Sequence, residues 1–253
     1  VIIANNSVAA DAGIDQTVCT STATLSAVKP ALGSGLWLKQ GSSTIDNKTS
    51  HITDVYNLVS GTNLFIWTVT KENCSAESEV IITNDSVVAD AGSDQQICST
   101  TAELAAAIPT LGTGRWKSFG TSVIDNKSLN STSVTNLASG SNTFFWTVTK
   151  GECTAKDDVV ITNNIPIVNA GVSQTVCSYE AILNGNQPDE GENGLWESVG
   201  ETAFITDNTY YKTTVTDLSP GSNTFRWTIT KNGCPASDDV VVTNNSFTVN
   251  AGN

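Results

Sequence analysis

The chain has 253 residues, of which 39% are hydrophobic, and this is enough for two or three modest hydrophobic cores. Its formal net charge of −13 argues against nucleic acid or an anionic membrane as a partner, because both require a basic face. Since no stretch approaches the roughly 18 apolar residues of a membrane span, no membrane insertion is expected in this segment.

One phrase occurs three times: NLFIWTVTKENC at 63–74, NTFFWTVTKGEC at 142–153 and NTFRWTITKNGC at 223–234. The cysteines and tryptophans recur with it at intervals of 79 to 81 residues. Such self-similarity is the signature of a repeat architecture. All six Cys and all six Trp thus belong to three copies of one unit: Cys19, Cys74, Cys98, Cys153, Cys177, Cys234, Trp37, Trp67, Trp116, Trp146, Trp196 and Trp227.

The copies are placed at 8–86 (unit 1), 87–165 (unit 2) and 166–246 (unit 3). Residues 1–7 are predicted to be the last strand of an upstream copy, and residues 247–253 the first strand of a downstream copy. The array is therefore expected to continue in both directions. Further copies of the same repeat in the parent chain are the expected neighbours of this segment.

Within a unit the pattern indicates β-structure from end to end, as unit 2 illustrates. Short runs of alternating apolar and polar residues, rich in Thr, Val and aromatic residues, are typical of strands. No apolar stripe with a period of 3.6 residues is long enough for a helix. The strands expected in chain order are 87–92, 95–98, 102–107, 114–120, 131–137, 143–150 and 157–163.

Seven short strands with turn residues between them, in about 80 residues, are typical of an immunoglobulin-like sandwich. The fold class is therefore predicted to be all-β, with three tandem immunoglobulin-like domains in an extended rod. The six tryptophans are expected in the cores of the sandwiches rather than in a carbohydrate site, because they recur at equivalent strand positions. Gly61, Gly140 and Gly221 fit a corner that needs a left-handed residue.

The pattern DAGxDQxxC…W…TxVTxLxxGxNTFxWTxTKxxC…DDVVxTN resembles the PKD-like repeats of Bacteroidetes cell-surface proteins. It is most similar to the tandem repeats of giant flavobacterial gliding-motility adhesins, and the resemblance covers essentially the whole chain. Membership would imply a PKD-like sandwich, export by type IX secretion, and display as long filaments attached to the outer membrane. It would also imply a role in adhesion or gliding rather than in catalysis.

Six Cys in an exported, loop-rich chain suggest disulfides. A zinc site is not expected, because the sequence has no Cys/His cluster. In a PKD or immunoglobulin topology, the Cys after the first strand and the Cys of the last hairpin lie at opposite poles of a unit. Because the units abut with almost no linker, between-unit pairing is favoured: Cys19–Cys153 and Cys98–Cys234, with Cys74 and Cys177 pairing with absent neighbours. Free thiols and the within-unit pairs Cys19–Cys74, Cys98–Cys153 and Cys177–Cys234 stay open.

Two further surface features invite a functional interpretation. Asp11, Asp15, Asp90 and Asp94 flank the DAGxD turns and are weak candidates for calcium, although Asx-turns are the favoured explanation. Apart from possible calcium, no cofactor is expected. Outward strand positions that differ between units could form a contact face, with ordinary cross-strand covering pairs as the alternative: Leu36, Ile66, Arg115, Phe145, Leu195 and Arg226.

The residues for catalysis are missing, because His51 is the only histidine and no Ser/His/Asp or Cys/His set accompanies it. Together with the resemblance to gliding-motility adhesins, this predicts a non-catalytic stalk segment of a bacterial surface adhesin filament, which meets surface polysaccharide or another substratum. The alternative is a carbohydrate-binding or spacer module of a secreted polysaccharide-degrading enzyme.

Overall fold

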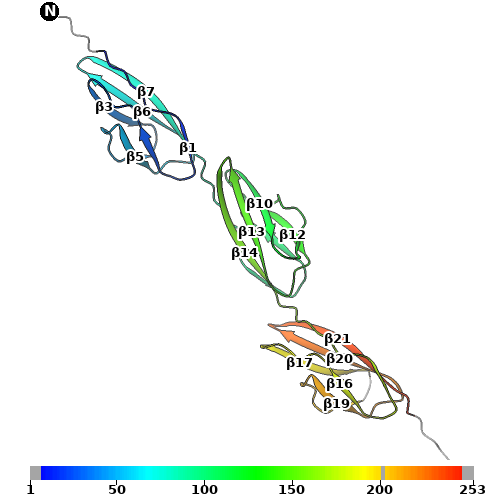
Figure 1. Cartoon of the computed structure of the whole chain (residues 1–253). Coiled ribbons are helices and arrows are strands. Elements are labelled where there is room, and N and C mark those ends of the chain that lie inside the picture. The colour runs from blue at the N-terminus through cyan, green and yellow to red at the C-terminus, as the bar shows by residue number, and fades with distance from the viewer. Residues whose placement is uncertain (1–6, 201–202, 247–253) are drawn as a thin grey trace, which may run out of the picture.

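A computed structural model describes residues 7–200 and 203–246 of the chain (Figure 1). Its 21 regular elements are all strands, and three sandwiches of seven strands follow one another along an extended rod. The predicted fold class, three immunoglobulin-like sandwiches in tandem, is confirmed. The pieces of neighbouring copies expected at 1–7 and 247–253 lie, apart from Ser7, outside the described residues.

Unit 1 contains a four-stranded sheet in the order β1-β7-β6-β3 and a three-stranded sheet in the order β2-β5-β4. In the four-stranded sheet β1 runs parallel to β7, whereas the other pairs are antiparallel. The strands are β1 (Gln16–Val18), β2 (Ala23–Ser26), β3 (Ser34–Lys39), β4 (Thr44–Ile45), β5 (Ile52–Tyr56), β6 (Gly61–Lys71) and β7 (Cys74–Asn84).

Units 2 and 3 repeat this topology, with sheets β10-β13-β14-β8 and β11-β12-β9 in unit 2, and β15-β21-β20-β17 and β16-β19-β18 in unit 3. The strands of unit 2 are β8 (Gln95–Ile97), β9 (Ala102–Ala105), β10 (Thr113–Ser118), β11 (Val123–Ile124), β12 (Ser131–Thr135), β13 (Gly140–Lys150) and β14 (Cys153–Asn163). Those of unit 3 are β15 (Gln174–Val176), β16 (Ala181–Asn184), β17 (Glu192–Val199), β18 (Phe204–Ile205), β19 (Lys212–Thr216), β20 (Gly221–Lys231) and β21 (Cys234–Asn244).

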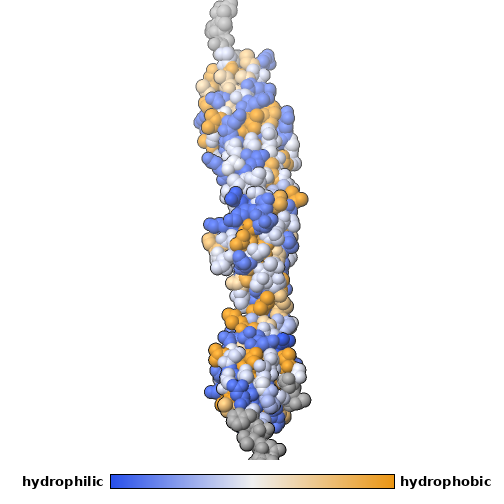
Figure 2. All heavy atoms as spheres, turned by 90° about the vertical axis from the view of Figure 1, so that its right-hand side faces the viewer, coloured by the Kyte–Doolittle hydropathy of each residue, from blue (hydrophilic) through white to orange (hydrophobic). Residues whose placement is uncertain are grey.

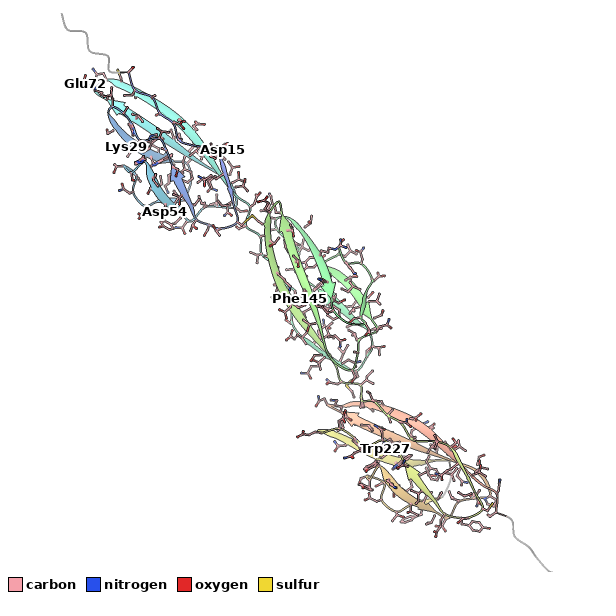
Figure 3. All side chains as sticks on the ribbon, in the orientation of Figure 1. Asp15, Lys29, Asp54, Glu72, Phe145 and Trp227 are labelled. Atoms are coloured by element: carbon pink, nitrogen blue, oxygen red, sulfur yellow. A yellow bond between two sulfur atoms is a disulfide. The ribbon has the colours of Figure 1, made fainter. Side chains whose placement is uncertain are left out.

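Each core is centred on a pair of tryptophans directly opposite one another in the four-stranded sheet. In unit 1 Trp37 on β3 pairs with Trp67 on β6, and the ring centroids are 4.9 Å apart. Both side chains are fully buried, as are their counterparts in units 2 and 3, among them Trp227 in Figure 3. The sequence-based placement of the tryptophans agrees with this arrangement.

A glycine two residues before the first tryptophan makes room for the second indole. A Cβ atom on Gly35 would lie 1.9 Å from Cζ2 of Trp67, and a Cβ on Gly114 would lie 1.9 Å from the same atom of Trp146. No side chain fits at these positions, because the indole already fills the space. The repeated Gly-x-Trp spacing is therefore a packing requirement.

The first strand predicted for unit 2, at 87–92, is not a regular strand in the structure. The segment makes few ladder bonds: the Asp90 carbonyl accepts from the Ala107 N–H at 2.9 Å, and Ala91 donates its N–H to the Asp157 carboxylate at 2.7 Å. Its alternating apolar residues still pack on the core, since Ala91 is buried. Burial alone therefore produced the alternating pattern that the prediction interpreted as a strand.

The three sandwiches alternate in orientation along the rod. In Figure 1 the four-stranded sheets of units 1 and 3 lie toward the upper right, and that of unit 2 lies toward the left. Figure 2 shows that hydrophobic residues are scattered among polar ones over the visible face. Neighbouring units therefore present their larger sheets to opposite sides of the rod.

Candidate functional site: the junctions between units

Two disulfides join neighbouring units, one at each junction. Cys19 of unit 1 is bonded to Cys153 of unit 2, and Cys98 of unit 2 is bonded to Cys234 of unit 3. In both bonds the Cα atoms are 5.3 Å apart, within the usual range for a disulfide. The structure thus contains the between-unit pairs and not the within-unit pairs of the alternative.

Strand order explains why the bonds cross the junctions. Cys19 follows β1, whose last residue Val18 lies beside Asn84 at the far end of β7. Cys74 lies at the opposite end of β7, in the hairpin with Lys71. Eleven residues of extended chain span roughly 33 Å, which is far too long for a disulfide within the unit.

Cys74 and Cys177 are free, and both are exposed. Cys74 occupies the hairpin position that Cys153 and Cys234 occupy in the later units, whereas Cys177 occupies the position of Cys19 and Cys98. The bonded hairpin cysteines are only 2% exposed. The two free thiols are thus the staple positions that face the two ends of the described rod.

The main chain between units is held by hydrogen bonds that extend the parallel ladder. Asp85 donates its N–H to the Val18 carbonyl at 2.9 Å, and Asn164 donates likewise to the Ile97 carbonyl at 2.8 Å. The buried Asn84 accepts from the Ser86 N–H at 3.0 Å and donates to the Leu58 carbonyl at 3.1 Å.

Asn163 and Asn244 repeat this arrangement in units 2 and 3. Each junction therefore leaves its unit in a defined direction rather than through a loose linker.

Polar side chains from the next unit also reach the junctions. Lys150, at the end of β13, forms an ion pair with Asp85 at 3.4 Å. At the second junction the Asn232 amide donates to the Asn164 side-chain oxygen at 3.2 Å. The hairpin of each following unit is therefore joined to the preceding unit by a disulfide and to the linker by a polar pair.

The four calcium candidates are engaged in local hydrogen bonds. Asp11 and Asp90 each accept from the N–H of the glycine two residues later at 2.9 Å, and so form Asx-turns. Asp15 and Asp94 each accept a backbone N–H of the last strand of their unit at 2.8 Å. Among the described residues, no three His, Cys, Asp or Glu side chains come together as a metal site. Calcium at these turns stays a prediction.

The six contact-face candidates all point away from the cores. Leu36, Arg115, Leu195 and Arg226 are exposed, whereas Ile66 and Phe145 are half-buried. Side chains of the neighbouring strand cover two of them, as expected for covering pairs: Lys156 Nζ lies 3.7 Å from the centroid of the Phe145 ring, and Arg226 binds Asp239 through two hydrogen bonds of 2.7 and 2.8 Å. The hydrogen bonds from the guanidinium lower the pKa of Asp239.

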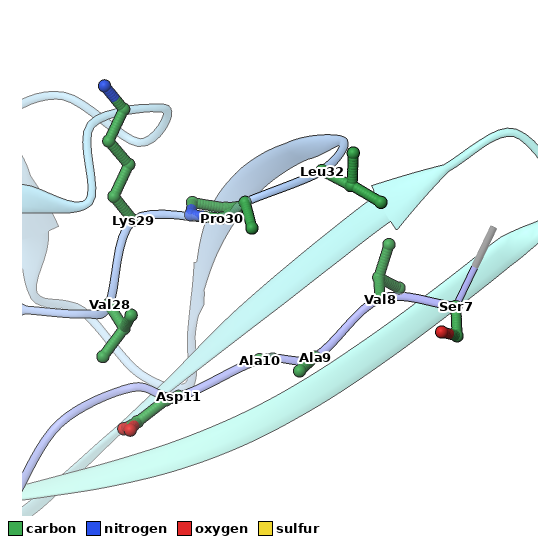
Figure 4. A pocket seen from close by; sticks show the side chains of 10 residues that line it. Ser7, Val8, Ala9, Ala10, Asp11, Val28, Lys29, Pro30 and Leu32 are labelled. Carbon is green, nitrogen blue, oxygen red and sulfur yellow. The ribbon is translucent and has the colours of Figure 1, made fainter. Parts of the chain in front are cut away.

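Two hollows on unit 1, one of them lined by His51, do not bring a Ser/His/Asp or Cys/His set together. One hollow of about 290 Å³ lies between residues 7–11 and 28–32 of unit 1, and in Figure 4 the side chains of Lys29 and Asp11 point away from it. His51 borders a neighbouring hollow with Trp67 and Leu36, and no Asp, Glu or Cys lines that hollow beside it.

In the described part of the chain, no helix is long and apolar enough to cross a membrane.

One set of structural residues was not predicted from the sequence: the asparagine two residues after each corner glycine. Asn63 is 4% exposed; its side-chain oxygen accepts from the Val59 N–H at 3.0 Å, and its amide donates to the Val59 carbonyl at 2.9 Å and to the Ile82 carbonyl at 3.3 Å. Asn142 and Asn223 make the same bonds. The repeated Gly-x-Asn spacing was the signal that could have revealed these buried asparagines.

No protein-family model matches the chain, and no curated protein matches it. Among solved structures, the N-terminal eight immunoglobulin domains of Down Syndrome Cell Adhesion Molecule have a TM-score of 0.54 and 9% identity, covering 95% of this chain and 37% of that one. The I67–I69 fragment of titin covers 96% of this chain and 100% of that one, with a TM-score of 0.47 and 9% identity. At 9% identity the similarity to the first of these two structures shows the fold alone, a tandem array of immunoglobulin-like domains.

Proposed function

We propose that this chain is a tension-bearing stalk segment of a bacterial cell-surface adhesin filament. The observation that supports this most is the disulfide at each junction, since Cys19–Cys153 and Cys98–Cys234 join units that the main chain already connects. Disulfides persist in oxidising compartments, which supports an extracellular location. A second covalent connection at each junction suits a module that has to transmit force.

The finer assignment rests on the resemblance to gliding-motility adhesins. On that basis the filament belongs to a Bacteroidetes cell, is exported by type IX secretion and is attached to the outer membrane. Cys74 and Cys177 then pair with further copies of the repeat on either side, because their counterparts are bonded to neighbours. Surface polysaccharide or another substratum would be bound elsewhere on the filament.

The rival function, a carbohydrate-binding or spacer module of a secreted polysaccharide-degrading enzyme, has less support. Tryptophans are the largest rings for stacking on a sugar, and all six are buried, whereas the exposed rings, such as Phe119 and Tyr210, are smaller. A glycan array probed with the isolated segment tests the rival directly. Specific binding to one glycan class would favour it over the stalk.

The stalk function is tested by adhesion under flow. Cells whose parent protein carries Cys98→Ser and Cys234→Ser should attach normally without flow and detach at a lower shear stress. The matched control carries Ser75→Ala, a change at an exposed position next to a hairpin cysteine that leaves both disulfides intact. Equal detachment of the bond-deficient and control cells would contradict a role in transmitting tension.

A further inference from the structure

The outer face of the four-stranded sheet differs in charge between units 1 and 2. In unit 2 this cationic face carries three exposed basic residues and two aromatic rings: Arg115, Lys117, Lys156, Phe119 and Phe145. In unit 1 the acidic face carries three apolar residues and two exposed glutamates at equivalent strand positions: Leu36, Leu38, Ile66, Glu77 and Glu79. The two faces are thus complementary in charge, and both have an apolar centre.

The cationic face is organised around its two phenylalanines. The rings of Phe119 and Phe145 pack edge to face with centroids 5.6 Å apart, and Phe119 is 63% exposed. Lys156 Nζ lies 3.7 Å from the centroid of the Phe145 ring, and Lys117 Nζ lies 4.8 Å from that of Phe119. Asp158, paired with Phe145 across the sheet, is the acidic residue of this face. Figure 3 shows Phe145 toward the left side of unit 2.

The acidic face of unit 1 has the apolar residues and negative charges that would complement the cationic face of unit 2. Leu36 and Leu38 are 42% and 45% exposed, and they lie on β3 next to the half-buried Ile66 of β6. Glu77 and Glu79 follow on β7 and replace Lys156 and Asp158 of unit 2. Exposed apolar residues beside charges of one sign are typical of a protein-contact surface.

We propose that the cationic face of unit 2 binds the acidic face of unit 1 of a second copy of this chain. A copy of the chain is the partner that the charges favour, since the cationic face is a local exception on a chain of net charge −13. Unit 3 is a poorer partner because Arg226 offsets one of the two acidic residues on its face, Glu197 and Asp239, whereas no basic residue offsets Glu77 and Glu79 on β7 of unit 1. Opposite charges across the contact fix its register more than they add affinity.

The orientation of the units determines the form of the assembly. Because the larger sheets of units 1 and 2 lie on opposite sides of the rod in Figure 1, the two faces of one chain point to different neighbours. The contact is therefore heterologous, staggers neighbouring rods by one unit, and can propagate sideways. Each contact is small and weak, so bundling depends on repetition along the filament.

Charge reversal tests this proposal by sedimentation velocity over a concentration series at low salt. Cys74→Ser and Cys177→Ser are introduced throughout, so that no disulfide can link chains. The parent of the series should self-associate, and the association should weaken as salt is raised. The variants K117E/K156E and E77K/E79K should each sediment as monomers when alone.

The decisive sample is the equimolar mixture of the two charge-reversed variants. Both faces of K117E/K156E are acidic and both faces of E77K/E79K are basic, so each variant finds a face of opposite charge only on the other variant. Association should therefore return in the mixture. The variant K212E is the control: it also makes the chain more acidic, by half the change in K117E/K156E, and its exposed side chain lies on β19 in the smaller sheet of unit 3, away from both faces; it should associate like the parent. Thermal melting confirms that every variant is folded.

Three results would overturn the proposal: a monomeric parent of the series at all concentrations, self-association of K117E/K156E at the parental level, or no recovery in the mixture. If instead the parent is monomeric and polygalacturonate binds it through Lys117 and Lys156, an anionic polysaccharide is the occupant of the face. The proposal does not rest on the stalk function. Its failure would leave the junction disulfides and the flow-chamber result unaffected.

Discussion

The junction disulfides should limit how far the rod can be pulled out, and the limit follows from the connectivity. Consider tension applied between residues 7 and 246 of a chain with Cys74→Ser and Cys177→Ser. With both disulfides intact, the shortest covalent path follows 7–19, crosses to 153, returns to 98, crosses to 234 and ends at 246. The chain outside this path carries no tension once the path is straight.

The greatest lengths that the oxidised and the reduced chain can reach differ about threefold. The covalent path contains roughly 79 residue steps, so with about 3.5 Å per step the fully unfolded chain should reach roughly 290 Å. After reduction all of the roughly 239 steps are available, which gives about 840 Å. Replacing Cys19 and Cys153 by Ser leaves one staple and a path of roughly 103 steps, or about 365 Å.

Single-molecule force spectroscopy measures these contour lengths directly. In the same background, a within-unit bond between Cys98 and Cys153 would instead leave roughly 184 steps, or about 650 Å. Final lengths near roughly 290, 365 and 840 Å for the oxidised, single-staple and reduced chains would confirm the connectivity. An oxidised chain that extends to about 650 or 840 Å would refute the reasoning.

Three smaller predictions concern stability and can be checked by thermal or urea unfolding. Gly114→Ala should destabilise unit 2 by about 3 kcal/mol, since the new Cβ would clash with the buried Trp146. Asn142→Ala should cost about 1–3 kcal/mol, because it leaves buried backbone groups at the corner without partners. Arg226→Ala should make the stability of unit 3 less dependent on acidic pH. In the folded protein Arg226 lowers the pKa of Asp239 below its unfolded value of about 4, so the ionised carboxylate stabilises the fold above that pH. This stabilisation is lost as pH falls through the lower folded pKa, and without Arg226 there is less of it to lose. An unchanged pH profile for that variant would contradict the last prediction.

The repeated tryptophans and cysteines allowed much of this architecture to be predicted. Alternation along 143–150 identified a strand that buries Trp146, because one face of a sandwich strand is always buried. The pairing of Cys19 with Cys153 could be expected because an immunoglobulin-like topology places the two cysteines of a unit at opposite poles. That inference needed the fold first and could not be made from spacing alone.

The features that were missed depend on three-dimensional contacts. Gly35 differs from other glycines of the chain only because the Trp67 indole occupies the place of its Cβ. Asn63 was overlooked because a polar residue within a strand usually faces solvent, whereas here the buried amide donates to the Val59 and Ile82 carbonyls. Likewise, the charge contrast between Lys156 and Glu77 becomes informative only when both are known to lie on the same outward face.

Unit 2 shows how a stapled unit would carry tension within a longer array. It is crossed from pole to pole by two nearly extended segments, 87–98 and 153–163, which lie side by side where β8 runs parallel to β14. Each segment ends at a disulfide to a different neighbour. In the chain with Cys74 and Cys177 replaced, residues 99–152 complete the shortest covalent path, whereas in an array with every staple closed tension can follow the two segments and bypass those residues. In an array where Cys74 and Cys177 are also paired, every unit would have this arrangement. Such a filament would resist stretching through covalent bonds, and the sandwiches would serve to keep the two segments aligned rather than to resist unfolding.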